Sequence, residues 1–169
     1  MAKNLSNKIL NVIFSISAVL ILALDQFTKY FINKQPGEIF PIEIIPNLFY
    51  ISRVTNTGAA FGLFQDKTNV FIIISIIAII LIIILKIKLN LPSVFYNLGL
   101  GFILGGAAGN LVDRLIFSGQ VTDYLHLEYF AVFNVADSFI VIGFGIMLII
   151  IIKTFFKKEP AKEIDQEKK

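Results

Sequence analysis

Four stretches of the chain lack charged residues and consist mainly of Ile, Leu, Val and Phe. They cover residues 9–24, 68–85, 89–112 and 138–152. A helix needs about 20 apolar residues to cross a bilayer, so the first and fourth stretches reach that length only if the polar residues at their ends lie at membrane depth. The pattern therefore predicts an all-α membrane bundle of four spanning helices, at about residues 9–31, 68–88, 93–116 and 137–156.

The segment between the first two predicted helices, residues 33–67, has a different pattern. Prolines divide it into short runs of β-forming residues, most of them within 39–51, and such runs are typical of short strands. We therefore expect a small β structure at the membrane surface. Residues 157–169 alternate acids and bases, as solvated tails do, so residues 1–156 are expected to form one membrane domain.

Lysine and arginine set the expected orientation, because they accumulate on the cytoplasmic side of membrane proteins. With both termini in the cytoplasm, ten of the 15 Lys and Arg residues lie on that side. Residues 33–67 and 113–137 then lie outside. Apart from the four acids of the tail, all acidic residues fall on the outer side: Asp25, Glu38, Glu43, Asp66, Asp113, Asp123, Glu128 and Asp137.

Composition supports a membrane protein and excludes several kinds of chemistry. The chain is 56% hydrophobic and only 16% charged, against roughly 25% charged residues in soluble domains. The net charge of +3 is too small and too scattered to indicate nucleic-acid binding. Without cysteine there are no disulfides, thiol nucleophiles or cysteine metal sites. The single histidine, His126, is expected to be a loop residue, and it disfavours a histidine metal centre or a Ser-His triad.

Five short segments place polar and small residues within apolar surroundings, all on the outer side. Polar groups at membrane depth are costly and are usually functional, so five of them at one depth indicate a shared site. The segments are Asp25–Lys29, Asn56–Gly62, Gly109–Arg114, Val121–Tyr124 and Phe133–Ser138.

Several of these residues also have structural explanations. Asp25 and Lys29 are spaced i,i+4, and an ion pair on the helix explains them better than chemistry does. Asn56 and Gly58 fit a turn. For Asp113, interfacial anchoring and chemistry are equally good interpretations.

Residues of the third predicted helix also have structural explanations. Arg114 can reach the interface as a long cationic side chain, while Asn110 shares a helix face with the acid three residues later. Glycines recur every four residues from Gly101 to Gly109, which is typical of close helix packing.

Asp123 and Asp137 are harder to explain structurally. Asp137 could cap the fourth helix, but Asn134 is already a capping candidate. The two aspartates lie 14 positions apart, so they meet only if the third and fourth helices pack with their outer ends together. Two close carboxylates share a proton, so that one can act as a base on water and the other as an acid toward a carbonyl.

These residues and spacings resemble the lipoprotein signal peptidases (signal peptidase II), over nearly the whole chain. The segments that carry the resemblance are Asn56-Thr57-Gly58-Ala59-Ala60-Phe61-Gly62, Gly109-Asn110 with Asp113-Arg114, and Phe133-Asn134-Val135-Ala136-Asp137.

The resemblance implies an aspartic endopeptidase that removes signal peptides from prolipoproteins, cleaving before a diacylglyceryl-modified cysteine, without metal or other cofactor. It implies a multi-pass protein of the bacterial cytoplasmic membrane, in contact with lipid but not nucleic acid, with an active site and a β-cradle at the extracytoplasmic face. Asp123 and Asp137 match the catalytic positions. Positions that line or support the site match Asp25, Lys29, Asn56, Gly58, Asn110, Asp113, Arg114, Asn134 and Ala136. We expect a monomer.

Further expectations concern individual residues. Asn56 and Asn134 would hold backbone amides of the peptide, Arg114 would support the loop geometry, and the small-residue face of the third helix would leave room for the substrate. Two details depart from the family pattern: Thr122 replaces an aliphatic residue, and the segment 126–132 is short.

Two other functions are alternatives to this one. A small transporter also uses carboxylates inside the membrane, but it needs them at the midplane or on both sides. A non-catalytic scaffold that docks a helix on the glycine face leaves the two aspartates unexplained.

Overall fold

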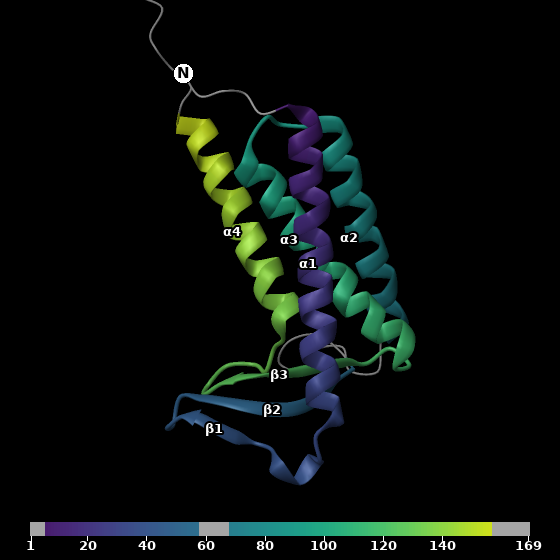
Figure 1. Ribbon diagram of the computed structural model, residues 1–169, viewed down its shortest axis with the longest axis vertical. Helices are drawn as coiled ribbons and strands as arrows, with labels where there is room; N and C mark the ends of the chain where they lie inside the picture. Colours follow the sequence, from purple (N-terminus) through teal and green to yellow (C-terminus); the bar gives the residue numbers. More distant parts are fainter. Residues whose placement is uncertain (1–5, 58–67, 157–169) are drawn as a thin grey trace, which may run out of the picture.

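The computed structural model describes residues 6–57 and 68–156. It shows four long helices with a small antiparallel sheet across one end of the bundle (Figure 1). The elements follow in the order α1 (Asn7–Lys34), η1 (Gly37–Ile39), β1 (Ile42–Ile45), β2 (Phe49–Asn56), α2 (Thr68–Leu89), α3 (Val94–Ile116), β3 (Val121–Leu127) and α4 (Val135–Phe156). Gly58 and the predicted tail lie outside the described residues.

All four helices are long and apolar enough to cross a membrane. Their outward surfaces are apolar, as on α2 and α4, where Ile87 is 73% exposed and Val141 70% exposed. Exposed apolar surface of this extent is expected where lipid is the solvent. The prediction of four helices long and apolar enough to span a membrane is therefore confirmed.

The helix ends differ from the predictions at α1 and α4. The first helix begins earlier than residue 9, because the Ser6 hydroxyl accepts the backbone N–H of Ile9 at 3.4 Å. It continues to Lys34 and stops at Gln35, which is extended, as residues before a proline usually are. The fourth helix begins at Val135 rather than at residue 137.

α3 packs against each of the other three helices, and its glycines allow the closest approaches. A Cβ added at Gly105 would lie 2.5 Å from a backbone oxygen of α1, and one at Gly106 2.5 Å from a backbone oxygen of α4. Close helix packing is thus confirmed as the role of these glycines. The expectation that this face leaves room for a substrate is wrong, because α1 and α4 already fill it.

The sheet has the order β1-β2-β3, with β3 nearest the helices (Figure 1). Strands were predicted within 33–67, and β1 and β2 confirm that part. The run around Ile39 is instead the short helix η1.

The third strand, β3, was not predicted. It pairs with β2 along most of its length, from Phe49 opposite Leu127 to Asn56 opposite Val121. His126 therefore lies in a strand and not in a loop, and its Nδ1 is 3.1 Å from the hydroxyl of Ser52 on β2. The pairing carries the end of β2 alongside the segment that contains one of the predicted catalytic aspartates.

Candidate active site

Asp123 on β3 and Asp137 in the first turn of α4 are linked by one side chain, that of Asn134. The Asn134 Nδ2 donates to Asp123 Oδ1 at 2.7 Å, and its Oδ1 accepts the backbone N–H of Asp137 at 2.9 Å. The Asp137 carboxylate accepts the backbone N–H of Asn134 in return, at 3.3 Å.

This reciprocal pair is a capping box, in which the residue before the helix and the third helical residue bond each other's backbone N–H. Asn134 is therefore the helix cap, and the alternative that Asp137 is the cap is wrong. The capping box also fixes the direction of the Asp137 carboxylate relative to the backbone of α4.

Two further amides hold the remaining carboxylate oxygens. Asn110 Nδ2 on α3 donates to Asp137 Oδ1 at 2.7 Å, and Asn56 Nδ2 at the end of β2 donates to Asp123 Oδ2 at 2.9 Å. Asn110 Oδ1 also accepts the Nδ2 of Asn134 at 3.1 Å. Each aspartate thus accepts hydrogen bonds from two different residues, all of them neutral donors.

The expectation that Asn134 binds the substrate backbone is wrong. Its side chain is 0% exposed, and both ends of its amide are already hydrogen-bonded within the site. Asn134 supports the two aspartates instead. Asn56 is only partly buried, so its contact with peptide stays a prediction.

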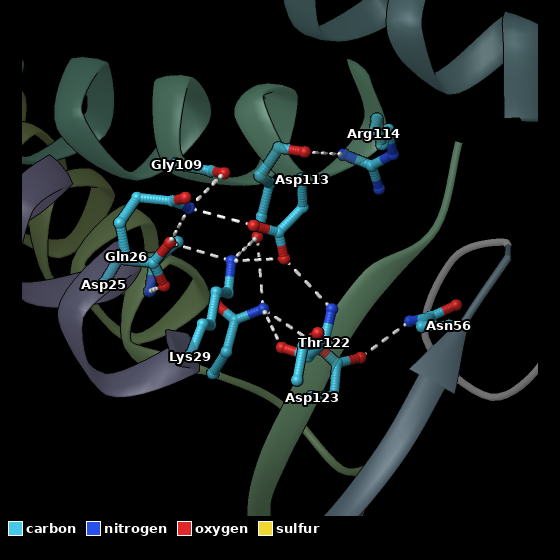
Figure 2. Close-up of polar contacts among 12 residues, drawn as sticks. Asp25, Gln26, Lys29, Asn56, Gly109, Asp113, Arg114, Thr122 and Asp123 are labelled. Carbon is cyan, nitrogen blue, oxygen red and sulfur yellow. Dashed lines mark hydrogen bonds and ion pairs between the residues drawn. The ribbon is translucent and has the colours of Figure 1, made fainter. Parts of the chain in front are cut away.

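Beside the aspartates lies a buried ionic cluster, formed by Asp25 and Lys29 of α1 and Asp113 of α3 (Figure 2). The Lys29 Nζ is 2.8 Å from Asp25 Oδ2 and 3.2 Å from Asp113 Oδ2, and it donates to Asn110 Oδ1 at 3.0 Å. The predicted i,i+4 pair is confirmed, but its exposure of 3% or less makes it unlike an ordinary surface pair.

The ionic cluster also holds the backbone next to each predicted catalytic residue. Asp25 Oδ1 accepts the N–H of Ala136 at 2.9 Å, and Asp113 Oδ2 accepts the N–H of Thr122 at 3.0 Å. Ala136 directly precedes Asp137, and Thr122 directly precedes Asp123. The cluster therefore fixes the start of α4 and the middle of β3 against α1 and α3.

Sequence reasoning missed Gln26. Its Nε2 donates to Asp113 Oδ1 at 2.9 Å, to the Gly109 carbonyl at 3.1 Å and to Asp25 Oδ2 at 3.2 Å. A single amide thus bridges the two acids that flank Lys29. The available signal was the position of Gln26 in the polar segment Asp25–Lys29, just after the apolar run of the first helix.

Contacts between β3 and α1 were missed as well. The Tyr124 hydroxyl donates to Thr28 Oγ1 at 2.6 Å, and Asn33 Nδ2 donates to Thr122 Oγ1 at 3.0 Å. Thr122, the departure from the family pattern, therefore has a polar partner on α1. Burial raises the pKa of Tyr124 to about 12, so this phenol is a neutral donor.

Arg114 contacts neither aspartate in the described part of the chain. Its Nη1 donates to Ser75 Oγ of α2 at 3.4 Å and to the Asn110 carbonyl at 3.5 Å, and its guanidinium lies 5.4 Å from the centroid of the Phe71 ring. In Figure 2 it points away from the ionic cluster. Its expected role in supporting a loop stays a prediction, as does that of Gly58.

The electrostatics of Asp123 make its carboxyl easier to protonate than an ordinary aspartate. The residue is 2% exposed, and burial raises its pKa to about 6, helped by the negative charge of Asp137. The hydrogen bonds from Asn56 and Asn134 act in the opposite direction, as does the charge of Lys29. The effect of burial is larger, because the free energy that a carboxylate loses on desolvation exceeds the free energy that these hydrogen bonds supply.

No group of three or more His, Asp or Glu side chains within residues 6–57 and 68–156 has an arrangement that could hold a metal ion. The expected absence of a metal cofactor stays a prediction.

The family model described as signal peptidase (SPase) II matches residues 17–153, a region that contains every candidate site residue. The chain belongs to the signal peptidase II family. It is therefore a protease of the membrane, and the transporter and scaffold alternatives do not apply.

Individual relatives agree with this assignment. The chain is 45% identical over 136 residues to a lipoprotein signal peptidase of Brevibacillus brevis, covering 78% of this chain and 89% of that protein. It is 47% identical over 124 residues to one of Caldanaerobacter subterraneus subsp. tengcongensis, covering 73% of this chain and 84% of that protein.

Two solved structures, each described as a bacterial membrane enzyme determined by the in meso method, share the fold. One is 33% identical with a TM-score of 0.77 and covers 86% of this chain and 92% of its own. The other is also 33% identical, with a TM-score of 0.69, and covers 85% of this chain and 92% of its own. The signal peptidase II assignment thus rests on sequence and on fold.

Proposed function

We propose that this signal peptidase II is an aspartic endopeptidase that removes signal peptides from prolipoproteins. It would cleave the bond before a diacylglyceryl-modified cysteine, with Asp123 and Asp137 activating a water molecule. The observation that carries the proposal is the side chain of Asn134, which bonds the carboxylate of Asp123 and the backbone of Asp137 at 2.7 and 2.9 Å.

The environments of the two aspartates support different roles. Burial raises the pKa of Asp123 to about 6, so Asp123 is the more easily protonated member of the pair and acts as the acid when it carries the shared proton. Asp137 accepts hydrogen bonds from Asn110 and from the backbone of Asn134, which stabilise its ionised form. Titration nevertheless belongs to the pair, because each charge affects the other.

The reaction then follows from these roles. Asp137 takes a proton from water, the water oxygen attacks the peptide carbonyl carbon, and Asp123 donates its proton to the carbonyl oxygen. When the tetrahedral intermediate collapses, the C–N bond breaks, Asp137 gives its proton to the departing nitrogen, and Asp123 takes back the hydroxyl proton. Both carboxyls return to their starting state.

The position of the site fits a substrate that arrives from within the bilayer. Asp123 belongs to β3 and Asp137 to the first turn of α4, and both of these elements lie at the end of the bundle that carries the sheet (Figure 1). With the termini in the cytoplasm, as the distribution of Lys and Arg predicts, this end faces the outside of the bacterial cytoplasmic membrane. The sheet would then be the extracytoplasmic cradle.

Cleavage of a defined substrate tests the proposal. Purified protein is incubated with a diacylglyceryl-modified prolipoprotein, and the size shift of the precursor is followed. Wild type should cleave, and Asp123→Asn and Asp137→Asn should each lose activity by at least about a hundredfold. Glu38→Gln, which changes an exposed carboxylate on η1, is the matched control and should cleave normally.

Circular dichroism of both variants separates lost chemistry from lost fold. Wild-type rates in both folded variants would refute the catalytic pair. Equal cleavage of an unlipidated precursor would instead refute the stated substrate, since the lipid would then contribute nothing to recognition.

A further inference from the structure

A lysine that the proposed mechanism does not use is buried near the end of α2. Lys86 is only 7% exposed. Its Nζ donates to Asn90 Oδ1 at 2.9 Å and lies 5.8 Å from the centroid of the Phe14 ring of α1. Within the described residues no carboxylate forms an ion pair with it. A buried ammonium with only neutral partners is costly, so the site is incomplete without an anion.

Charges at this end of the bundle are all of one sign in the described ranges. α1 begins here with Lys8, α2 ends with Lys86 and Lys88, and α4 ends near Lys153. Every described Asp and Glu belongs to the opposite half, with the sheet and the active site. The field around Lys86 therefore attracts an anion from outside the described chain.

A cavity of about 370 Å³ opens beside Lys86, between α1 and α2. Its polar lining includes Asn11 and Ser15 of α1 and Asn90, the residue that follows α2. Asn11 and Ser15 are exposed on the outer surface of a spanning helix, one turn apart, and neither has a hydrogen-bond partner among the described residues. Unpaired polar groups are disfavoured against hydrocarbon, so these side chains also lack a ligand.

The depth of the cavity matches lipid headgroups. Lys86 lies three residues before the end of α2 at Leu89, which is about 5 Å along the helix axis at 1.5 Å per residue. The apolar part of α2 is long enough to span the hydrocarbon core. Its last turn therefore lies where acyl chains give way to phosphate groups.

We propose that the cavity between α1 and α2 binds the phosphate group of an anionic phospholipid. Lys86 supplies the charge, and Asn11, Ser15 and Asn90 supply hydrogen bonds. The apolar part of the lining, including Phe14 and Ile83, contacts the start of the acyl chains. The site lies at the other end of the bundle from the active site and does not depend on the proposed catalytic roles.

Native mass spectrometry of the full chain in detergent micelles tests this site. Phosphatidylglycerol should be retained in preference to phosphatidylcholine. Lys86→Met keeps the length and apolar stem of the side chain and should weaken phosphatidylglycerol binding by about tenfold, or about 1.4 kcal/mol. Lys88→Met removes an exposed charge from the same turn and should change binding less than about twofold.

A second variant keeps the test decisive if Lys86→Met does not fold. Replacing both Asn11 and Ser15 with Ala leaves α2 intact and should weaken phosphatidylglycerol binding by about threefold or more. Equal retention of the two lipids, or wild-type affinity in the folded variants, would overturn the proposal. Displacement of the lipid by millimolar inorganic phosphate would also overturn it, because the cavity would then be a site for free anions.

Discussion

Replacing Asp123 with Asn should stabilise the protein, and the gain should depend on pH. The carboxyl is 2% exposed, and its pKa rises from an ordinary value of 3.8 to about 6 on folding. A group with a raised pKa favours the folded state below its unfolded value. That advantage is lost as the pH rises through the folded value. Above pH 6, wild type therefore keeps an ionised group in a place that disfavours ionisation.

The size of the effect follows from the two pKa values of Asp123. Each pKa unit corresponds to about 1.36 kcal/mol, so a rise from 3.8 to about 6 costs wild type about 3 kcal/mol at neutral pH. The variant does not carry this cost, because Asn does not titrate. It does lose one hydrogen bond, since both Asn56 and Asn134 donate to this side chain and an amide accepts with one atom only. That loss, about 1 kcal/mol, does not depend on pH.

The assay compares melting temperatures of wild type and Asp123→Asn in detergent micelles from pH 4 to pH 8, by circular dichroism. The difference between the two proteins should grow by about 2.5 kcal/mol across this range, or roughly 5–10 °C for a chain of this size. Glu38→Gln controls for the lost charge and should change stability by less than about 0.5 kcal/mol. A difference between wild type and Asp123→Asn that stays constant with pH would refute the raised pKa of Asp123.

Three further predictions concern packing and support of the site. Gly105→Ala should destabilise the fold by about 1–3 kcal/mol, since its Cβ would lie 2.5 Å from a backbone oxygen of α1. Gly145→Ala is the control and should be neutral, because a Cβ there would have nothing within 4 Å. Equal melting temperatures for the two variants would contradict the close packing of α3. Asn134→Ala should lower kcat at least tenfold and cost about 1–3 kcal/mol of stability, because it removes the cap of α4 and leaves buried hydrogen-bond partners unpaired. Unchanged turnover in the cleavage assay would remove its positioning role. Lys29→Met should lower the free energy of unfolding by about 3–5 kcal/mol, because it leaves buried carboxylates unpaired. Adding Asp25→Asn should recover part of that loss. A double variant no more stable in thermal unfolding than Lys29→Met would contradict the ion pairing.

Much of the candidate site could be read from residue types. The sequence indicates Asp123, Asp137, Asn110 and Asn56 as site residues because polar side chains are costly within apolar segments near a membrane. Their contacts were not readable, because hydrogen-bond partners such as Asn134 and Asp123 come from different elements. The role of Gln26 could not be predicted, because its amide bonds to Asp113 and Gly109 of α3 and a local sequence pattern does not show contacts between helices.

The fold divides in the same way. The four helices follow from local pattern, since backbone groups in lipid must be hydrogen-bonded within their own segment. The strand β3 does not follow from local pattern. Val121–Leu127 becomes a strand only by pairing with β2, which lies much earlier in the sequence. The glycines of α3 predicted close packing. They did not predict that α1 would pack against one side of the glycine surface of α3 and α4 against the other.

The sequence by itself determined which segments enter the membrane, and which few polar residues must be stabilised there, because burial in hydrocarbon makes each such residue costly wherever it occurs. Only the tertiary structure decided how those residues support one another. Lys29 lies between two acids, those acids hold the backbone before Asp123 and Asp137, and Asn134 joins the pair. These contacts depend on how three helices and a strand pack, which no local pattern specifies.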